Sequence, residues 1–263
     1  MTVLSNIDQA IAENSLHFVN RKTEYFDYKL LVRSKAEIKL NVAQNISIKS
    51  KSGEYISPLF AEKYQNDNPP FSLDQLNQED VWLDVGTHIG LFAVRMLTQF
   101  PKIKKVIGYE PFPANVEFAK QNLILNKVAD RCELVQKALI PDNRKQLALY
   151  LSSDSGKHSN LQVKNRETVK VKAENINKVI GKCTAMKMDI EGYEIELITA
   201  INDWSNIRIF FLEYHFNAIK GNRLEIWNEI FSILQKNFDF IYYNQAAPLQ
   251  KNFITHLACV KKA

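Results

Sequence analysis

A chain of 263 residues is long enough for one large domain with an ample core, and 46% hydrophobic and 24% charged residues are typical of a globular protein. The net charge of +5 comes from lysines scattered through all segments, so charge does not indicate a nucleic-acid partner. No apolar stretch approaches the ~20 residues of a membrane helix, and the N-terminus lacks the apolar core of a signal peptide. Cys132, Cys183 and Cys259 are far apart, with no Cys-x-x-Cys pair, which predicts reduced thiols, no zinc site and a cytoplasmic location.

The first stretch of the chain, residues 1–75, differs in pattern from the rest. Leu4, Ile7 and Ile11 are at helical spacing, residues 26–32 and 38–48 alternate between hydrophobic and polar, and a short helix is expected over 55–64. We expect a small α+β extension packed on a main domain that covers residues 76–263. A cover over a ligand cleft, a structural brace and a dimer contact all fit this pattern, and the oligomeric state stays open.

From residue 81 onward, strands alternate with helices, which predicts an α/β fold with a mainly parallel sheet and helices on both faces. The expected strands are 81–85, 105–110, 132–137, 184–190 and 207–215, and the expected helices are 89–99, 114–126, 192–201 and 223–236.

Two hairpins add to this alternation. One is an insertion between the third and fourth strands, predicted from the alternating leucines at 147–151 and the valines at 169 and 171. Its polar tip, residues 152–160, either borders a bound ligand or is a bare surface loop. The second hairpin, 238–243 with 255–260, makes the last strand antiparallel.

A turn at residues 84–90 follows the first strand of the alternating region. The strand ends in Asp84, and the chain then turns at Gly86 and enters a helix through Gly90. Gly86 can adopt a positive φ and let the backbone approach a ligand, while the helix N-terminus offers unpaired N–H groups. The next strand ends in Glu110, and an acidic side chain at that point suits the hydroxyls of a ribose. The alternative to a nucleoside site is an ordinary strand–turn–helix with a solvated Glu110.

The fourth strand carries charges where a buried strand should be apolar. Lys187, Asp189 and Glu191 follow one another at period two and are expected on one face, at the carboxyl end where open α/β sheets bind ligands. Unpaired charges on a central strand are costly, so a functional site is the preferred interpretation. Lys187 alone has a simpler explanation, the neutralisation of a carboxylate.

The fifth strand also ends in polar residues. Glu213 and His215 lie on the same face as apolar residues earlier in the strand. If strands four and five are neighbours, ~4.8 Å apart, Asp189, Glu213 and His215 converge on one cleft. Oriented by a carboxylate, a histidine can remove a proton at neutral pH. The alternative is a hydrogen-bonded pair of Glu213 and His215 that only stabilises the strand end.

Taken together, these segments resemble the FkbM family of S-adenosylmethionine-dependent methyltransferases. The resemblance covers about residues 80–262 and is carried by four motifs, the most specific being the third: Asp84-Val-Gly-Thr-His-Ile-Gly90, Glu110-Pro111, Met186-Lys-Met-Asp-Ile-Glu-Gly-Tyr-Glu194 and Leu212-Glu-Tyr-His215. It implies a seven-stranded class I methyltransferase (Rossmann-like) sheet and S-adenosyl-L-methionine as cofactor. It also implies O-methylation of a hydroxyl on a small-molecule or glycan acceptor, such as a sugar or a polyketide-like metabolite.

The resemblance also assigns residues by position. Asp84, Gly86 and Gly90 would form the cofactor turn, with Thr87 and His88 where the family usually has Ala-Asn, and with Ala93 where it often has Ser or Thr. Further along the chain, the resemblance assigns one group to each part of the cofactor: Glu110 to the ribose, Phe112 with Lys137 and Ala138 to the adenine, and Asp189 to the methionine moiety.

Methyl transfer to an alcohol needs a group that removes the hydroxyl proton, and His215 or Glu213 is the expected base, with Asp189 beside them. A divalent metal on these three residues is a second mechanism that the ligand spacing does not prove. A rival enzyme class, an NAD-dependent or nucleotide-sugar oxidoreductase, needs Gly-x-Gly-x-x-Gly, of which only Gly86 and Gly90 are present. A non-catalytic nucleoside-binding protein of the same fold is the other rival.

Overall fold

The computed structural model describes residues 17–22, 27–32, 76–152, 158–159, 161, 165–218, 221–243 and 254–262. Its strands are β1 (His17–Lys22), β2 (Asp27–Val32), β3 (Val81–Val85), β4 (Lys105–Tyr109), β5 (Cys132–Val135), β6 (Ala138–Ile140), β7 (Gln146–Tyr150), β8 (Thr168–Asn175), β9 (Ala185–Met188), β10 (Ile209–His215), β11 (Phe240–Tyr243) and β12 (Ile254–Val260). The α-helices are α5 (Leu91–Gln99), α6 (Pro113–Leu125), α7 (Glu194–Ala200) and α8 (Arg223–Asn237). Short 3₁₀ helices lie in the connections between these elements, at Ala129–Arg131, Ile176–Lys178, Ile180–Lys182 and Phe216–Ala218.

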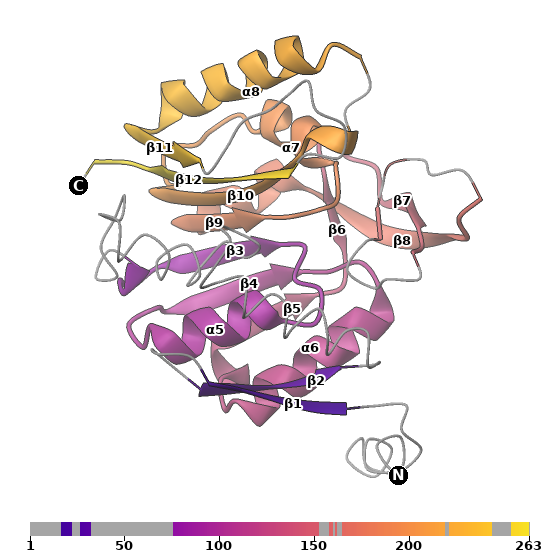
Figure 1. The fold of residues 1–263 in the computed structure, drawn as a ribbon, viewed down its shortest axis with the longest axis vertical. Coiled ribbons are helices and arrows are strands. Elements are labelled where there is room, and N and C mark those ends of the chain that lie inside the picture. The colour runs from indigo at the N-terminus through magenta and orange to yellow at the C-terminus, as the bar shows by residue number, and fades with distance from the viewer. Residues whose placement is uncertain are drawn as a thin grey trace.

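The central sheet has seven strands in the order β11-β12-β10-β9-β3-β4-β5 (Figure 1). Strands β10, β9, β3, β4 and β5 are parallel, and β12 is antiparallel to both of its neighbours. The chain winds outward from β3 through β4 to β5 and then returns to β9 on the other side of β3. This reversal makes the carboxyl ends of β3 and β9 the point where open α/β sheets bind ligands.

Two hydrophobic cores, one on each face, hold the sheet between helices. Alternation along β3 divides its side chains, because Trp82 belongs to the core under α5, whereas Leu83 and Val85 belong to the core under α7 and α8. The second core also includes β6, β7 and β8, which form a three-stranded sheet. Both faces of the strands are therefore buried, as the near-continuous apolar runs in the sequence indicate.

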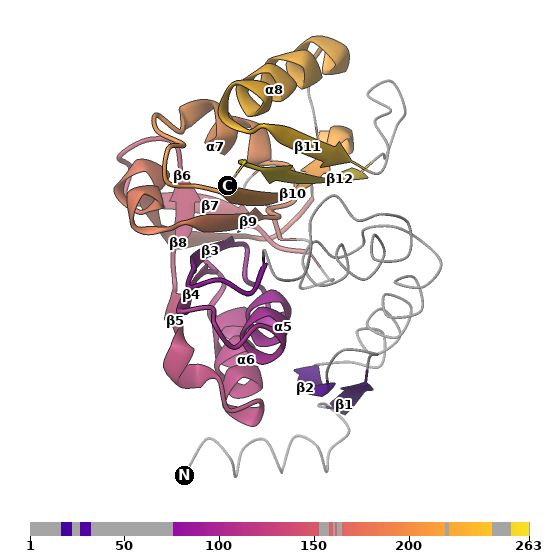
Figure 2. The same cartoon turned by 90° about the vertical axis from the view of Figure 1, so that its left-hand side faces the viewer.

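Of residues 1–75, the structure describes β1 and β2, an antiparallel pair that lies beside α5 and α6 (Figure 2). Strand β2 falls in the alternating segment predicted over 26–32. The expected helices at 4–11 and 55–64 and the strand at 38–48 lie outside the described residues. The boundary between an extension, 1–75, and a main domain, 76–263, therefore stays a prediction.

The predicted alternation of strands and helices is confirmed, with element ends shifted by at most two residues. The insertion forms the expected hairpin of β7 and β8, and the last strand is antiparallel as predicted. The predicted fourth strand, 184–190, is wrong at its end, because β9 stops at Met188 and Glu191 adopts a left-handed turn conformation with φ 56°. Among the described residues, no helix has both the length and the apolarity needed to cross a bilayer.

Candidate active site

The turn after β3 is held in place by its neighbours on both sides. The backbone N–H groups of Gly86 and Thr87 both donate to the Tyr109 carbonyl at the end of β4, at 3.0 and 3.1 Å. Gly86 has a φ of +84°, and a Cβ on it would lie 1.9 Å from the carbonyl oxygen of Asp189, at the end of β9. Only glycine fits this turn, because the backbone that follows β9 passes directly against it.

Beneath this turn, Asp84 is fully buried and pairs with Lys187. The Lys187 ammonium lies 3.3 Å from Asp84 Oδ1 and 3.7 Å from Asp189 Oδ2, and it donates a 2.7 Å hydrogen bond to the Gly86 carbonyl. Burial raises the pKa of Asp84, which the nearby Lys187 opposes. The simpler explanation of Lys187, neutralisation of a carboxylate, is thus confirmed, and Asp84 supports the turn from below.

Glu110 follows the carboxyl end of β4 and is hydrogen-bonded to the turn after β3. Its Oε2 accepts the backbone N–H of His88 at 3.0 Å, and its Oε1 accepts the N–H of Phe112 at 2.9 Å and the amide of Asn115 at 3.3 Å. Burial raises the pKa of Glu110 to about 7, although these hydrogen bonds favour the ionised form. Since a carboxylate offers about four acceptor positions, Oε2 keeps room for a further hydroxyl donor.

The predicted adenine edge of Phe112, Lys137 and Ala138 stays a prediction, and the structure shows where these residues lie. Phe112 is half-buried and its ring meets that of His158 edge-on, with centroids 4.6 Å apart. The Lys137 side chain turns away to form a 2.9 Å ion pair with Glu174 on β8, and Ala138 is buried at the start of β6. Any contact of Lys137 with a nucleoside would therefore come from its backbone.

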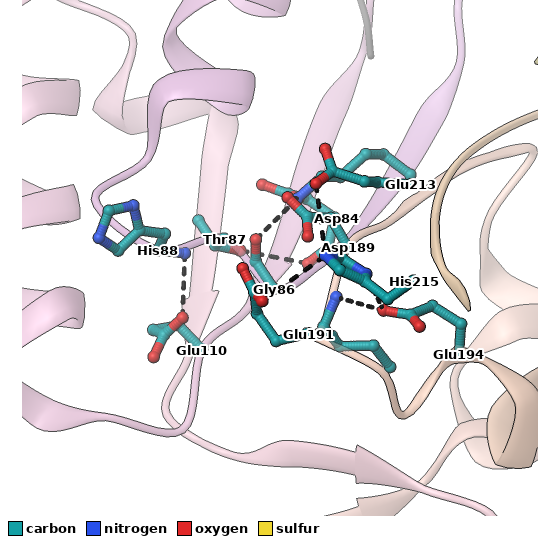
Figure 3. Close-up of polar contacts among 12 residues, drawn as sticks. Asp84, Gly86, Thr87, His88, Glu110, Asp189, Glu191, Glu194, Glu213 and His215 are labelled. Carbon is teal, nitrogen blue, oxygen red and sulfur yellow. Dashed lines mark hydrogen bonds and ion pairs between the residues drawn. The ribbon is translucent and has the colours of Figure 1, made fainter. Parts of the chain in front are cut away.

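At the ends of β9 and β10, His215 is surrounded by carboxylates (Figure 3). Its Nε2 lies 3.4 Å from Glu213 Oε1 and 3.5 Å from Glu191 Oε2, and one ligand atom each of Asp189, Glu191 and His215 lie within 4.8 Å of one another. We call Asp189, Glu191, Glu213 and His215 the His215 cluster. The pairing of β9 with β10 brings Asp189, Glu213 and His215 together, as predicted from adjacent strands, and Glu191 joins them from the turn after β9.

Glu194 fixes the orientation of the His215 ring from behind the cluster. Its Oε1 lies 3.0 Å from Nδ1 of His215 and also accepts the backbone N–H groups of Ile190 and Gly192. Since this oxygen is a carboxylate acceptor, Nδ1 is the donor, and Nε2 is the ring nitrogen that faces the cluster. Both side chains are almost fully buried, 2% and 1% exposed, so the ring cannot turn freely.

The pKa values of three groups in the cluster, Glu191, Glu213 and His215, are shifted from their usual values. Burial alone would lower the pKa of His215, but the charges of Glu194 and Glu213 raise it well above its usual value. Burial raises the pKa of Glu191 and of Glu213, with His215 opposing both shifts and the charge of Asp189 adding to them. Such a concentration of shifted groups at the ligand-binding edge of a sheet is typical of a functional site.

The sequence interpretation gave no specific role to two residues beside His215. Glu191 was included in the functional set of the fourth strand but not among the expected catalytic residues, and Glu194 was only part of a motif, yet they flank the two ring nitrogens of His215. The available signal was the succession Asp189, Glu191 and Glu194 around Gly192, which places three carboxylates on one tight turn.

The described part of the 152–160 insertion also reaches the site. His158 packs on Phe112, and Ser159 Oγ donates a 2.9 Å hydrogen bond to the Glu191 carbonyl. The insertion thus contacts both the residue expected beside adenine and the turn that carries Glu191.

The solved structures that are similar to this chain include methyltransferases of low sequence identity. An O-methyltransferase from Bacillus cereus in complex with SAH matches with a TM-score of 0.42 and 11% identity, over 86% of this chain and 90% of that one. A SAM-dependent O-methyltransferase from Thermotoga maritima matches with a TM-score of 0.44 and 11% identity, over 93% and 78%. A precorrin-6y C5,15-methyltransferase from Geobacter metallireducens matches with a TM-score of 0.42 and 12% identity, over 72% and 83%. No curated protein matches the sequence.

A family model decides the assignment. The model described as "Methyltransferase FkbM domain" matches residues 84–242, more than half of the chain, from the end of β3 into β11. The matched segment contains the Gly86 turn, Glu110 and the whole His215 cluster. The strand order and the antiparallel last strand are those of a class I methyltransferase. The chain therefore belongs to the FkbM methyltransferase family.

Proposed function

We propose that this protein transfers a methyl group from S-adenosylmethionine to a hydroxyl of a sugar, a glycan or a polyketide-like metabolite. The observation that carries the proposal is the meeting of two sites at one sheet edge. The Gly86 turn and Glu110 lie at the ends of β3 and β4, where they would bind the nucleoside, and the His215 cluster lies beside them at the ends of β9 and β10 (Figure 3).

The residues at β3 and β4 fit this cofactor. Gly86 brings the backbone close to the ligand path, and Glu110, buried beside His88, has an acceptor position left for a ribose hydroxyl. Asp189 is 30% exposed beside the turn, where its carboxylate can meet the cationic methionine moiety. When bound, S-adenosylmethionine supplies a methyl group on a positively charged sulfur, which leaves readily.

The His215 cluster fits the acceptor half of the reaction. An alcohol is a poor nucleophile until it loses its proton, and the groups placed to remove it are the carboxylates of Glu213 and Asp189 and, when the ring is neutral, Nε2 of His215. Much of the remaining rate enhancement would come from holding the hydroxyl in line with the methyl group. We propose that the 152–160 insertion borders this acceptor, because Ser159 is bonded to the turn of Glu191.

The acceptor is proposed to be a small molecule or glycan, with no nucleic acid as partner. A cytoplasmic location is part of the same proposal, supported by Cys132, Cys183 and Cys259, which are all unpaired thiols. The oxidoreductase alternative loses support, since the turn has Thr87, His88 and Ile89 between its two glycines.

The proposal is tested first by cofactor choice. Calorimetry should show that the full chain binds S-adenosylhomocysteine and not NAD. Incubation with radiolabelled S-adenosylmethionine and a panel of sugars, glycans and polyketides should then label an oxygen of one class. Preference for NAD, or no binding of either ligand, would refute the assignment.

Replacing Glu110 by Ala should weaken binding of S-adenosylhomocysteine by roughly 10–100-fold, because hydrogen bonds to a charged group contribute about 1.5–3 kcal/mol. Calorimetry measures the change. Glu229→Ala, which removes an exposed carboxylate from α8, is the control and should bind like the parent. Equal affinity of the Glu110 variant and the parent, with both folded, would remove Glu110 from the site.

The pH dependence of the same affinity follows from the pKa of Glu110, about 7 in the folded protein. Hydroxyl donors favour the ionised carboxylate, so binding below this pKa must release a proton. Affinity should therefore rise with pH up to about 7, by at most about tenfold per unit, and then level off. Glu110→Gln, which cannot titrate, should lose this rise. A parent affinity that stays flat from pH 5.5 to 8 would contradict the role of Glu110.

A further inference from the structure

The His215 cluster brings together more negative than positive groups in a largely buried place. Asp189, Glu191 and Glu213 face one another with Glu194 behind them, and the cations that act on Glu213 are His215 and Lys187. Lys187 is already shared between Asp84, Asp189 and the Gly86 carbonyl. Buried carboxylates are costly unless cations or hydrogen bonds offset their charge, so a bound cation would stabilise this cluster.

A second observation is independent of the charge count. Nε2 of His215 is buried and makes no hydrogen bond to any part of the chain that the structure describes, although it points into the cluster. It lies 3.4–3.5 Å from the oxygens of Glu213 and Glu191, close enough for an ion pair but not aligned as a hydrogen bond. A buried polar nitrogen without a hydrogen bond requires an explanation, and a bound ion is one of the usual ones.

The hydrogen bond of the His215 ring to Glu194 is of the kind that orients metal-binding histidines. A histidine that ligates a metal almost always donates its other ring N–H to a carboxylate or carbonyl, which fixes the tautomer and ring orientation. Glu194 accepts from Nδ1 of His215 at 3.0 Å and is itself held by two backbone N–H groups. This leaves Nε2 as the ring nitrogen that faces the carboxylates of Glu191 and Glu213, and it would lose its proton on binding a metal.

We propose that Asp189, Glu191 and His215 bind a divalent first-row transition ion such as Mn²⁺, with Glu213 beside it. The three ligand atoms lie within 4.8 Å of one another. Ligands on opposite sides of an octahedral ion stand about twice the bond length apart, ~4.1 Å for Mg²⁺ and about 4.6–5.2 Å for Ca²⁺. The cluster is thus wide enough to admit such an ion, and Asp189 and Glu191, 30% and 26% exposed, can move to close on it.

The donor set selects among ions of this size. Mg²⁺ and Ca²⁺ prefer oxygen ligands alone, whereas an imidazole nitrogen among the ligands favours a first-row transition ion. Mn²⁺ is the member of that row that also suits carboxylate ligands, and it serves as the probe. Three protein ligands also leave coordination positions for an acceptor hydroxyl, whose pKa a divalent ion would lower. In this respect the inference rests on the proposed function and explains how the cluster would acidify an alcohol.

The test is a titration of the full chain with Mn²⁺ alone, without cofactor. The electron paramagnetic resonance signal of free Mn²⁺ measures how much of the ion is bound at each step. We expect one equivalent to bind, and Glu191→Gln and His215→Ala each to weaken binding at least tenfold. Glu194→Gln should weaken it by roughly 10–100-fold through the orientation of the ring. Glu229→Gln, the same change on the exposed face of α8, should bind Mn²⁺ like the parent, and thermal melts confirm that each variant is folded.

The result for the metal site can be distinguished from the result for the proposed methyltransferase function. Binding of S-adenosylhomocysteine and methyl transfer that survive complete chelation would overturn the metal site and leave the methyltransferase proposal standing. Absence of Mn²⁺ binding up to millimolar concentrations, or binding that Glu191→Gln and His215→Ala leave unchanged, would also overturn it. So would displacement of Mn²⁺ by S-adenosylhomocysteine, since Asp189, which also lies beside the proposed methionine site, would then serve the cofactor alone.

Discussion

Replacing His215 by Ala is expected to lower the turnover of methyl transfer by roughly 10²–10⁴-fold, while the affinity for S-adenosylhomocysteine changes little. Nε2 of His215 is the buried nitrogen that faces Glu191 and Glu213, so its loss removes either the proton acceptor or a metal ligand. The cofactor turn lies on β3 and β4 and does not use this ring. The measurement is kcat with an acceptor from the panel that the parent methylates, together with calorimetry for the cofactor.

Glu194→Gln serves as the companion variant, because Glu194 meets the His215 ring only at Nδ1, on the side away from the cluster. Its amide can still accept from Nδ1 of His215 through the side-chain oxygen, so a smaller loss of about 10–100-fold is expected. Full activity of His215→Ala with a true acceptor, with or without added metal, would remove the residue from the mechanism. Equal losses in turnover and in cofactor affinity would instead indicate a purely structural role.

The sequence predicts the fold well because the information is local and periodic. Apolar runs followed by turns located β3, β4, β9 and β10, and the alternation of polar and apolar residues identified the hairpins. Prediction was weakest at element ends. The charged residues after Met188 continue the period of a strand, but the backbone leaves the strand at that point because Gly192 and Glu191 both adopt positive φ.

The site was predicted only where neighbouring strands determine it. Adjacent β9 and β10 were enough to bring Asp189 and His215 together. The role of Glu194 could not be read from sequence, because it depends on α7 starting close enough to the β9 turn for its first residue to reach back to Ile190. The ion pair of the Lys137 side chain could not be read from sequence either, because its partner Glu174 comes from the inserted hairpin, whose packing no local pattern reveals.

The reason for Gly86 also differs from what the sequence suggested. A side chain there was expected to obstruct the cofactor. In the structure a Cβ would first meet the protein itself, 1.9 Å from the Asp189 carbonyl oxygen and 3.2 Å from the Ile190 side chain. The glycine is therefore needed for the packing of the β3 turn against the end of β9, before any ligand arrives.

Gly86→Ala is accordingly expected to destabilise the fold by about 3 kcal/mol or more, from backbone strain at φ +84° and from the clash with Asp189. Urea unfolding followed by circular dichroism measures the loss. Gly181→Ala is the matched control, because a Cβ at Gly181 meets nothing within 4 Å, and its stability should stay within about 0.5 kcal/mol of the parent. Equal unfolding midpoints for the two variants would show that the turn tolerates a side chain. The requirement for glycine would then have to come from the bound cofactor, as the sequence alone suggested.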